Sequence, residues 1–535
     1  MHFKFRVFTL VSAIVLFGSV CNSATITGTV KGVDGAPFQG AFVQAQNTKT
    51  KITVNVLSDG QGHYRVEKLP AGDYRVSIRA VGFKADPRTG VSLTADQNAS
   101  FDFSLQKGQV RWSDISQYQG YQLWPDAKGK QLIIDDCSIC HGFQSRMAAV
   151  RRDADGWKDR VAYMRTAMHF SISRLTDQEA DEIATYLTSL FGPDSVLPKS
   201  PEEMPKYKDT VRPFSSEAMN IVYVEYDMPG PSYMPFSAAP DKDGNLWIPD
   251  FGVANKITRL NPDTGAMTDF PVPNIGTAAV HSAVPGPDGS VWIAEQGSNK
   301  IGKWDPATQK VVEYQDPYEP GKEGIEEGGE KHTVRVDTKG NVWASGVPLS
   351  KFDPETKTFK NFPEVHRLYD VKPDKNGNVW FAVPRTNKIG FVDGKTDKLT
   401  QWTMPTNDSY PRRMEIAADG GIWVGEFNAG KLARFDPKTQ TFKEYVLPGP
   451  DPTPYALGID ADGYIWYNSH HQDTVGRFDP KTGKVIEYPF PHAELSMREF
   501  FLDAKGRMWY GSNPNNKVGY FYLAKTSGGT MSSSK

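Results

Sequence analysis

Apolar and polar residues alternate through the first part of the chain. Stretches such as 25–30 and 74–78 carry an apolar side chain at every second position, and turn-forming residues such as Asp34-Gly35 separate them. A period of two with tight turns is typical of antiparallel strands that bury one face. The pattern therefore predicts a small β-sandwich over residues 25–106.

A helical period replaces this alternation over residues 107–193. A short helix is expected to lead into Cys137, and a longer helix is expected from about Thr176. Thr176 and Glu179 have the spacing of a capping box, and Gly192 is a stop signal. We predict a small all-α domain here. The apolar stripe of the longer helix, at spacings of three and four, consists of Ile183, Tyr186, Leu187 and Leu190.

The chain after a Pro-rich, charged linker (194–217) is a repeat array. A tryptophan that follows a glycine turn recurs about every 40 residues, a period typical of four-stranded propeller blades. The last copy is one strand short, and segment 223–229 matches the missing strand, which predicts a closed seven-bladed β-propeller over 218–524 and a flexible tail over 525–535. The recurring residues are Trp247, Trp292, Trp343, Trp380, Trp423, Trp466 and Trp509.

The first 24 residues have the pattern of a secretory signal peptide. Lys4 and Arg6 precede an apolar run too short to span a bilayer, and small residues follow at Ser23 and Ala24. The mature protein is therefore expected to be periplasmic or secreted, without a transmembrane segment. The chain is multidomain and mainly β.

The charge and the cysteine content limit the functions that are compatible with the sequence. The 61 basic and 63 acidic residues are interspersed, which excludes a nucleic-acid footprint. Of three cysteines, one lies in the signal segment, and the others are Cys137 and Cys140, directly followed by His141. Two thiols at this spacing can add to the vinyl groups of a haem while the histidine binds iron. A thioredoxin-like pair lacks its βαβ context here, and a zinc site lacks two ligands.

This region resembles class I cytochromes c in its Gly129-Lys130 helix start, its C-x-x-C-H-Gly run and its C-terminal helix with Tyr-Leu. The resemblance implies covalent haem c, with Cys137, Cys140 and His141 binding it, and a redox partner protein.

The sixth iron ligand is less directly indicated. Met164 ends the pattern Trp157-x-x-x-Val161-x-x-Met164 and aligns with the methionine of small bacterial cytochrome domains. Met168, His169 and an open site are the alternatives, and so is Met164 as core filler. Met147 is too near His141 in sequence to reach the other haem face.

One residue in each blade is expected near the central channel, where propellers commonly bind ligands. The alternative is that these polar residues only solvate the channel mouth. The expected ring consists of Phe236, His281, His332, Tyr369, Arg412, Tyr455 and Arg498. A second ring, three residues after each tryptophan and four after Trp380, consists of Asp250, Glu295, Gly346, Pro384, Glu426, Ser469 and Ser512.

Two further resemblances concern the β-rich parts. Segments 35–37, 58–60 and 69–76 resemble carboxypeptidase regulatory-like domains, which implies an accessory module. The blades, as in 288–302, resemble virginiamycin B (streptogramin) lyases.

That second resemblance implies a Mg²⁺-assisted lyase with His281, Glu330 and His332 in catalytic roles. Gly346 stands where the family has a further carboxylate, and Glu295 follows His281 by fourteen residues instead. A rearranged divalent site of His281, Glu295 and Glu330 is therefore one expectation.

The sequence leads to three hypotheses, and it leaves open whether the chain is an enzyme. The first is an exported haem c electron-transfer protein whose propeller recognises or transforms a small molecule or docks a partner. The second is a Mg²⁺-dependent lyase-like enzyme at the propeller face. The third is a non-catalytic binding or sensor protein.

Overall fold

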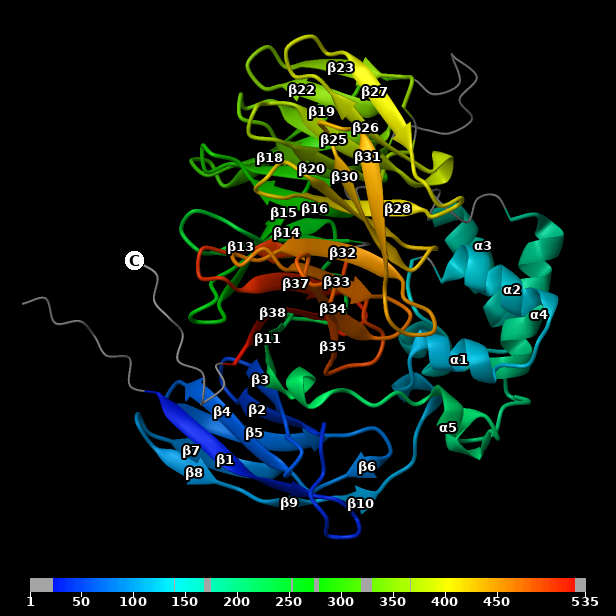
Figure 1. Ribbon diagram of the computed structural model, residues 1–535, viewed down its shortest axis with the longest axis vertical. Coiled ribbons are helices and arrows are strands. Elements are labelled where there is room, and N and C mark those ends of the chain that lie inside the picture. Colours follow the sequence, from blue (N-terminus) through cyan, green and yellow to red (C-terminus); the bar gives the residue numbers. More distant parts are fainter. Residues whose placement is uncertain are drawn as a thin grey trace, which may run out of the picture.

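The computed structural model describes residues 23–138, 140–167, 175–251, 254–273, 279–318, 330–365 and 367–524. The predicted tail and nearly all of the predicted signal segment lie outside these residues. Three parts are visible in Figure 1: a β-sandwich at one end, a stack of sheets from the middle to the opposite end, and helices along one side.

The N-terminal part is a two-layered β-sandwich, as its alternating pattern predicts. One layer has the order β4-β1-β8 with β9 beside β1, and the other contains β3-β2-β5-β7. Ile26 and Val66 from the first layer and Val43, Ala45 and Val76 from the second are fully buried between them. The strands are β1 Ala24–Lys31, β2 Phe42–Asn47, β3 Ile52–Leu57, β4 His63–Leu69, β5 Gly72–Arg79, β6 Phe83–Lys84, β7 Arg88–Leu93, β8 Asn98–Ser100, β9 Phe103–Ser104 and β10 Gln106–Lys107.

The repeat array folds into four-stranded antiparallel sheets, one per sequence repeat. The first three are β12 Ala239–Pro240, β13 Leu246–Asp250, β14 Lys256–Leu260 and β15 Met267–Pro271; β16 Val280–Pro285, β17 Val291–Glu295, β18 Lys300–Asp305 and β19 Lys310–Gln315; and β20 Glu330–Val336, β21 Val342–Val347, β22 Leu349–Asp353 and β23 Thr358–Phe362. The next three are β24 Asp370–Pro373, β25 Val379–Val383, β26 Lys388–Val392 and β27 Leu399–Thr403; β28 Pro411–Ile416, β29 Ile422–Glu426, β30 Lys431–Asp436 and β31 Thr441–Val446; and β32 Pro454–Ile459, β33 Ile465–Ser469, β34 Thr474–Phe478 and β35 Val485–Pro489.

The repeated tryptophan has a structural reason. In blade one the indole N–H of Trp247 donates to the Asp241 carboxylate at 3.0 Å, across the glycine turn that joins two strands. The same bond joins Trp343 to Asp337 at 2.9 Å. The aromatic ring is thereby held between neighbouring blades while its polar atom is satisfied.

The seventh blade closes the ring in the predicted way. It consists of β36 Phe501–Leu502, β37 Met508–Ser512, β38 Lys517–Leu523 and, from the start of the array, β11 Ile221–Asp227. Strand β11 pairs antiparallel with β38, with Tyr223 opposite Phe521. The inner strands contact one another in order, and β36 contacts β12, so the blades form a closed circle.

Strand β11 also joins the ring to the sandwich. Its other edge pairs with β3, with Tyr223 opposite Asn55 and Glu225 opposite Thr53. A single eight-stranded sheet therefore runs from the seventh blade into the sandwich. This pairing covers the outer edge of the blade, which would otherwise be open to another chain.

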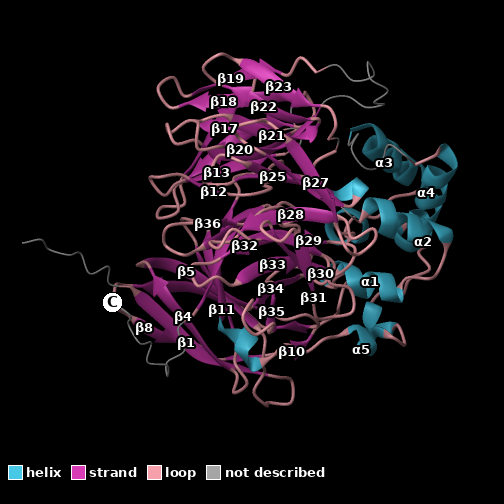
Figure 2. Ribbon diagram, turned by 45° about the horizontal axis from the view of Figure 1, so that its top comes forward, coloured by secondary structure: helices cyan, strands magenta, loops and turns pink. Residues whose placement is uncertain are grey.

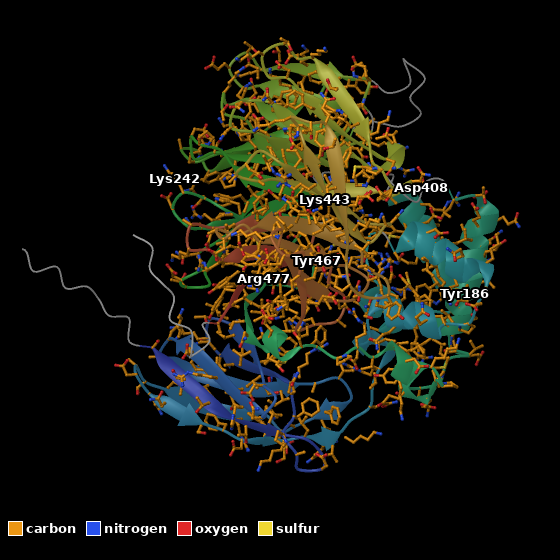
Figure 3. The ribbon with its side chains drawn as sticks, in the orientation of Figure 1. Tyr186, Lys242, Asp408, Lys443, Tyr467 and Arg477 are labelled. Atoms are coloured by element: carbon orange, nitrogen blue, oxygen red, sulfur yellow. The ribbon has the colours of Figure 1, made fainter. Side chains whose placement is uncertain are left out.

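The helices pack on one side of the propeller around a common core (Figure 2). In Figure 3, Tyr186 on α4 marks this helical part and Tyr467 lies within the ring of sheets. As predicted, Thr176 and Glu179 form a capping box at the start of α4, and Gly192 caps its end. The helices are α1 Gln117–Leu123, α2 Lys128–Leu132, α3 Ala154–Ala167, α4 Asp177–Phe191 and α5 Tyr207–Thr210.

Gly129 allows α2 to approach α4 closely. A Cβ atom at this position would lie 2.5 Å from Cβ of Tyr186, which no side chain tolerates without movement. The stretch predicted as a linker contains α5 and two 3₁₀ turns, Pro201–Glu203 and Ser216–Asn220. Within the described residues, no helix has the length and apolar character needed to cross a membrane.

Candidate functional site

The C-x-x-C-H segment follows α2 through a π-helical turn, Ile133–Cys137. The amide of Ser138 donates to the carbonyl of Ile133 at 2.9 Å, and the amide of Cys140 donates to the carbonyl of Cys137 at 3.3 Å. Both cysteines are free thiols, and burial raises the pKa of the Cys137 thiol. Ile139 lies outside the described residues.

Cys137 and His141 line a cavity with about 870 Å³ of space outside protein atoms, part of it open to solvent. Met164 on α3 lines the same cavity, together with Trp157 and Val161 from the same helix face. The pattern that singled out Met164 therefore corresponds to one wall of a real cavity. The other wall includes Ile183 and Leu187 of α4.

Met147 also lines this cavity, although it was not expected to be an iron ligand because it is so close to His141 in the sequence. It is carried by a second π-helical turn, Gln144–Ala148, and is 8% exposed. Met168 and His169, the other ligand candidates, lie outside the described residues.

The His141 ring is held in one orientation. Its Nδ1 lies 2.7 Å from the carbonyl oxygen of Gly142, so Nδ1–H donates and Nε2 keeps its lone pair for a metal. Burial, with the positive charge of Arg146 as a second cause, lowers the pKa of His141 to about 3. The imidazole is thus neutral, which is the form that binds metals.

Donors surround the cavity on the α3 side. Arg146, Arg152 and Arg160 line it. The Nε atoms of Arg146 and Arg152 and the indole Nε1 of Trp157 are buried without a hydrogen-bond partner among the described residues. Such orphaned donors fit a ligand that carries carboxylates into an apolar cavity, because they would supply the missing acceptors. The lining therefore fits the two propionates of a haem, and Cys137 and His141 face this space, whereas Cys140 is not among the residues that line it.

The seven channel positions lie together, as expected. Ring centroids are 4.9 Å apart for Phe236 and His281, 3.7 Å for His281 and His332, and 4.3 Å for His332 and Tyr369. The Arg498 guanidinium, 5.1 Å from the Phe236 ring, completes the circle.

The remaining side of the ring is aromatic and cationic. The Arg412 guanidinium lies 4.2 Å from the Tyr455 ring and 5.2 Å from that of Tyr369. The hydroxyl groups of Tyr369 and Tyr455 are hydrogen-bonded to each other. Arg413, which was not among the expected channel residues, is buried and pairs with Asp370 at 3.0 Å and Glu499 at 2.8 Å. Its only sequence signal is the Arg412-Arg413 doublet.

His281 and His332 are both neutral in this setting. Burial lowers the pKa of each well below its usual value, and nearby arginines act in the same direction. His332 Nδ1 lies 2.9 Å from the carbonyl oxygen of Tyr369, whereas Nδ1 of His281 has no hydrogen-bond partner among the described residues.

The carboxylates expected beside these histidines lie elsewhere. Glu295 accepts a hydrogen bond from Ser298 at 2.9 Å, and its Oε1 lies 3.1 Å from where a Cβ of Gly302 would stand, so it runs outward across β18. Glu330 accepts from Gln296 at 3.2 Å. No group of three or more His, Cys, Asp or Glu side chains that could hold a metal occurs within the described residues. The expected set of His281, Glu295 and Glu330 does not converge there.

The C-x-x-C-H motif and the channel ring are in contact. Arg498 donates one N–H to the carbonyl of Cys140 and another to the Tyr455 hydroxyl. The amide of Ser145 donates to the Glu494 carboxylate at 2.7 Å. These bonds seat the segment around His141 against the propeller, a relation that the sequence does not indicate.

Comparisons with known proteins found relatives of the propeller and of the sandwich. The virginiamycin B lyase family model matches residues 355–528, and the carboxypeptidase regulatory-like domain model matches residues 25–106. A streptogramin B lyase structure superimposes with a TM-score of 0.52 at 24% identity, covering 58% of this chain and 100% of that chain. Virginiamycin B lyase from Staphylococcus aureus gives 0.51 at 21% identity, covering 57% and 99%. The likeness establishes the propeller fold.

A curated relative covers only a small part of the chain. The TonB-dependent transporter Oar of Myxococcus xanthus is 30% identical over 99 residues, which are 18% of this chain and 9% of the transporter. The match therefore concerns one module and not the whole transporter.

Proposed function

We propose that this chain is an exported haem c protein that transfers electrons, with its propeller as the rigid seat of the haem-attachment segment and a surface for a ligand or partner. One observation carries the proposal. Cys137 and His141 line the same cavity as Met164, and three arginines line that cavity as well.

Different residues would bind different parts of the haem. Cys137 and Cys140 would hold the haem by thioether bonds, and His141 Nε2 and the Met164 sulfur would be the ligands of its iron. The group supplies one-electron redox chemistry when bound. The apolar wall of α3 and α4 excludes water, which favours the less charged redox state.

The donors on the cavity rim bind the carboxylates. Arg146 and Arg152 have buried, unused Nε donors, and the Trp157 indole has another. Hydrogen bonds from these donors to the propionates would orient the group and remove the cost of leaving the donors unsatisfied.

A lyase-like reaction at the propeller face is the second candidate, and the contact between His281 and His332 is the observation that favours it. A base and a divalent ion would both be needed there. Glu295 and Glu330 are hydrogen-bonded elsewhere, and Gly346 offers no carboxylate. We therefore rank this candidate below electron transfer.

The proposal places the protein in the cell envelope or outside the cell. The signal pattern of residues 1–24 supports export, and the partial likeness to a TonB-dependent transporter points to the same compartment. A redox partner protein then exchanges electrons with the haem.

Covalent attachment tests the function directly. Protein produced with a cytochrome c maturation system is expected to stay red after denaturation and acid–acetone extraction, and to show haem staining at the mass of the chain. The Cys137→Ala, Cys140→Ala double variant should lose the colour while keeping the β-rich circular dichroism of the wild type.

Colour that extracts into acid–acetone would contradict the proposal. So would one equivalent of zinc in protein that carries no haem, because this result would favour the zinc alternative for Cys137 and Cys140.

A further inference from the structure

A second, larger cavity lies where the three parts of the molecule meet. It has about 1620 Å³ of space outside protein atoms, part of it open to solvent. Phe42 comes from the sandwich, Tyr118 from α1, Phe214 from the chain between the helices and the propeller, and Phe490 from the sixth blade. Domain junctions with aromatic walls and a few polar groups are a common setting for small-molecule sites.

Almost every charged group in this lining already has a partner. Asp114 pairs with Arg111 at 2.7 Å, and Arg212 pairs with Glu487 at 2.6 Å. His492 lies 2.7 Å from Glu225.

Asp473 is also satisfied. Its carboxylate accepts the amide of Leu495 at 2.6 Å and the amide of Glu494 at 3.1 Å. Burial raises the pKa of Asp473 to about 7, so this group carries only part of a negative charge near neutral pH.

Arg79 is different. It ends strand β5 and lines the cavity, yet among the described residues its guanidinium has no hydrogen bond or ion pair. Burial lowers its pKa, and the carboxylates of Asp114, Asp473 and Glu225 only partly oppose this effect. The side chain is only partly buried, and the planar fork of donors of its guanidinium matches a carboxylate.

We propose that this junction cavity binds a small organic carboxylate with an aromatic or aliphatic body. Its carboxylate pairs with Arg79, and its body packs against Phe42, Phe214 and Phe490. The walls come from all three parts, so such a ligand also ties the sandwich, the helices and the propeller together. The site does not depend on haem.

Calorimetric titration of the full chain tests this site. The probes are phenylacetate, benzoate and octanoate, with phenylacetamide as the neutral isostere and acetate as the carboxylate without a body. At least one of the three acids is expected to bind saturably, and at least tenfold more tightly than phenylacetamide and acetate.

The Arg79→Gln variant should lose that binding at least tenfold. Arg75→Gln is the matched control, because Arg75 lies on the same strand, is exposed and does not line the cavity. Its affinity should equal that of the wild type.

Val211→Trp gives an independent check should Arg79→Gln fail to fold. Val211 lines the cavity and is 53% exposed, so a larger side chain there can fill the space without disturbing a core. It should weaken binding as well. No saturable heat with any of the three acids, or equal affinity in both cavity variants and the wild type, would overturn the proposal.

Discussion

At the scale of single residues, the haem-binding proposal depends on which nitrogen of His141 is free. The bond from Nδ1–H to the Gly142 carbonyl and the buried position both favour a neutral ring with Nε2 unprotonated. The thioether of Met164 is half-buried in the same cavity, and Met147 is a competitor that only the folded chain reveals.

Met164 can be separated from Met147 by spectroscopy. If Met164 binds the iron, the oxidised protein should show the weak charge-transfer band at the red edge of the visible spectrum, and Met164→Ala should remove it. Met147→Ala and Met168→Ala are the matched controls and should keep the band. Loss of the band in either control, with Met164→Ala unchanged, would assign the ligand to that methionine instead.

At the scale of secondary-structure elements, β-bulges between paired strands determine where the side chains of the channel ring point. The register between the first two strands of a blade shifts at His281, at His332, at Arg412 and at Tyr455. A β-bulge leaves one residue unpaired and re-aims its side chain. Regular strands would instead alternate these residues between the two faces of the blade. Glu295 is paired with Val280, beside the bulge, and with Lys300 of β18, and its carboxylate lies over β18 rather than toward His281.

This arrangement predicts weak or absent divalent binding at the channel. Mg²⁺ needs several oxygen ligands at short distance, and the two imidazoles there are not joined by a carboxylate. Calorimetric titration of the full chain with Mg²⁺, Mn²⁺ and Zn²⁺ should show no saturable heat of binding. Neither His281→Ala nor His332→Ala should change this result. Saturable Mg²⁺ binding that both variants abolish would instead support the lyase-like candidate.

At the scale of the whole molecule, the three parts are joined through contacts distant in sequence. The pairing of β11 with β3 makes one sheet of the seventh blade and the sandwich. Arg498 connects the Cys140 carbonyl to the Tyr455 hydroxyl of the channel ring. The propeller therefore holds the backbone of the C-x-x-C-H segment in place.

Removing this contact should loosen residues 137–147 selectively. In Arg498→Ala, amide hydrogen exchange over 137–147 should accelerate by about tenfold, since one such bond is worth on the order of 1–2 kcal/mol. Exchange in β37 and β38 should stay as in the wild type. Arg434→Ala, which removes a surface ion pair with Asp419, is the control and should leave 137–147 unchanged. Unaltered exchange over 137–147 in Arg498→Ala would show that the propeller does not hold the segment.

The sequence by itself determined the features that depend on local periodicity. The sandwich strands, the capped helix α4 and the closing strand β11 follow from alternation, capping residues and repeat spacing, which act over a few residues or one repeat. It also indicated the C-x-x-C-H motif, from the spacing of three neighbouring residues. It indicated one channel position per blade as well, because equivalent residues recur at the same place in every repeat. Haem binding at the motif and ligand binding in the channel stay predictions.

Only the tertiary structure decided how these pieces meet. The outward turn of Glu295, the contact of Arg498 with Cys140 and the exposure of Arg79 to the junction cavity each join residues from different strands or different parts. Bulges and the packing between the three parts set these relations, and neither leaves a periodic signal along the chain. The physical reason is that side-chain direction depends on partner strands and packed neighbours, which a single segment does not specify.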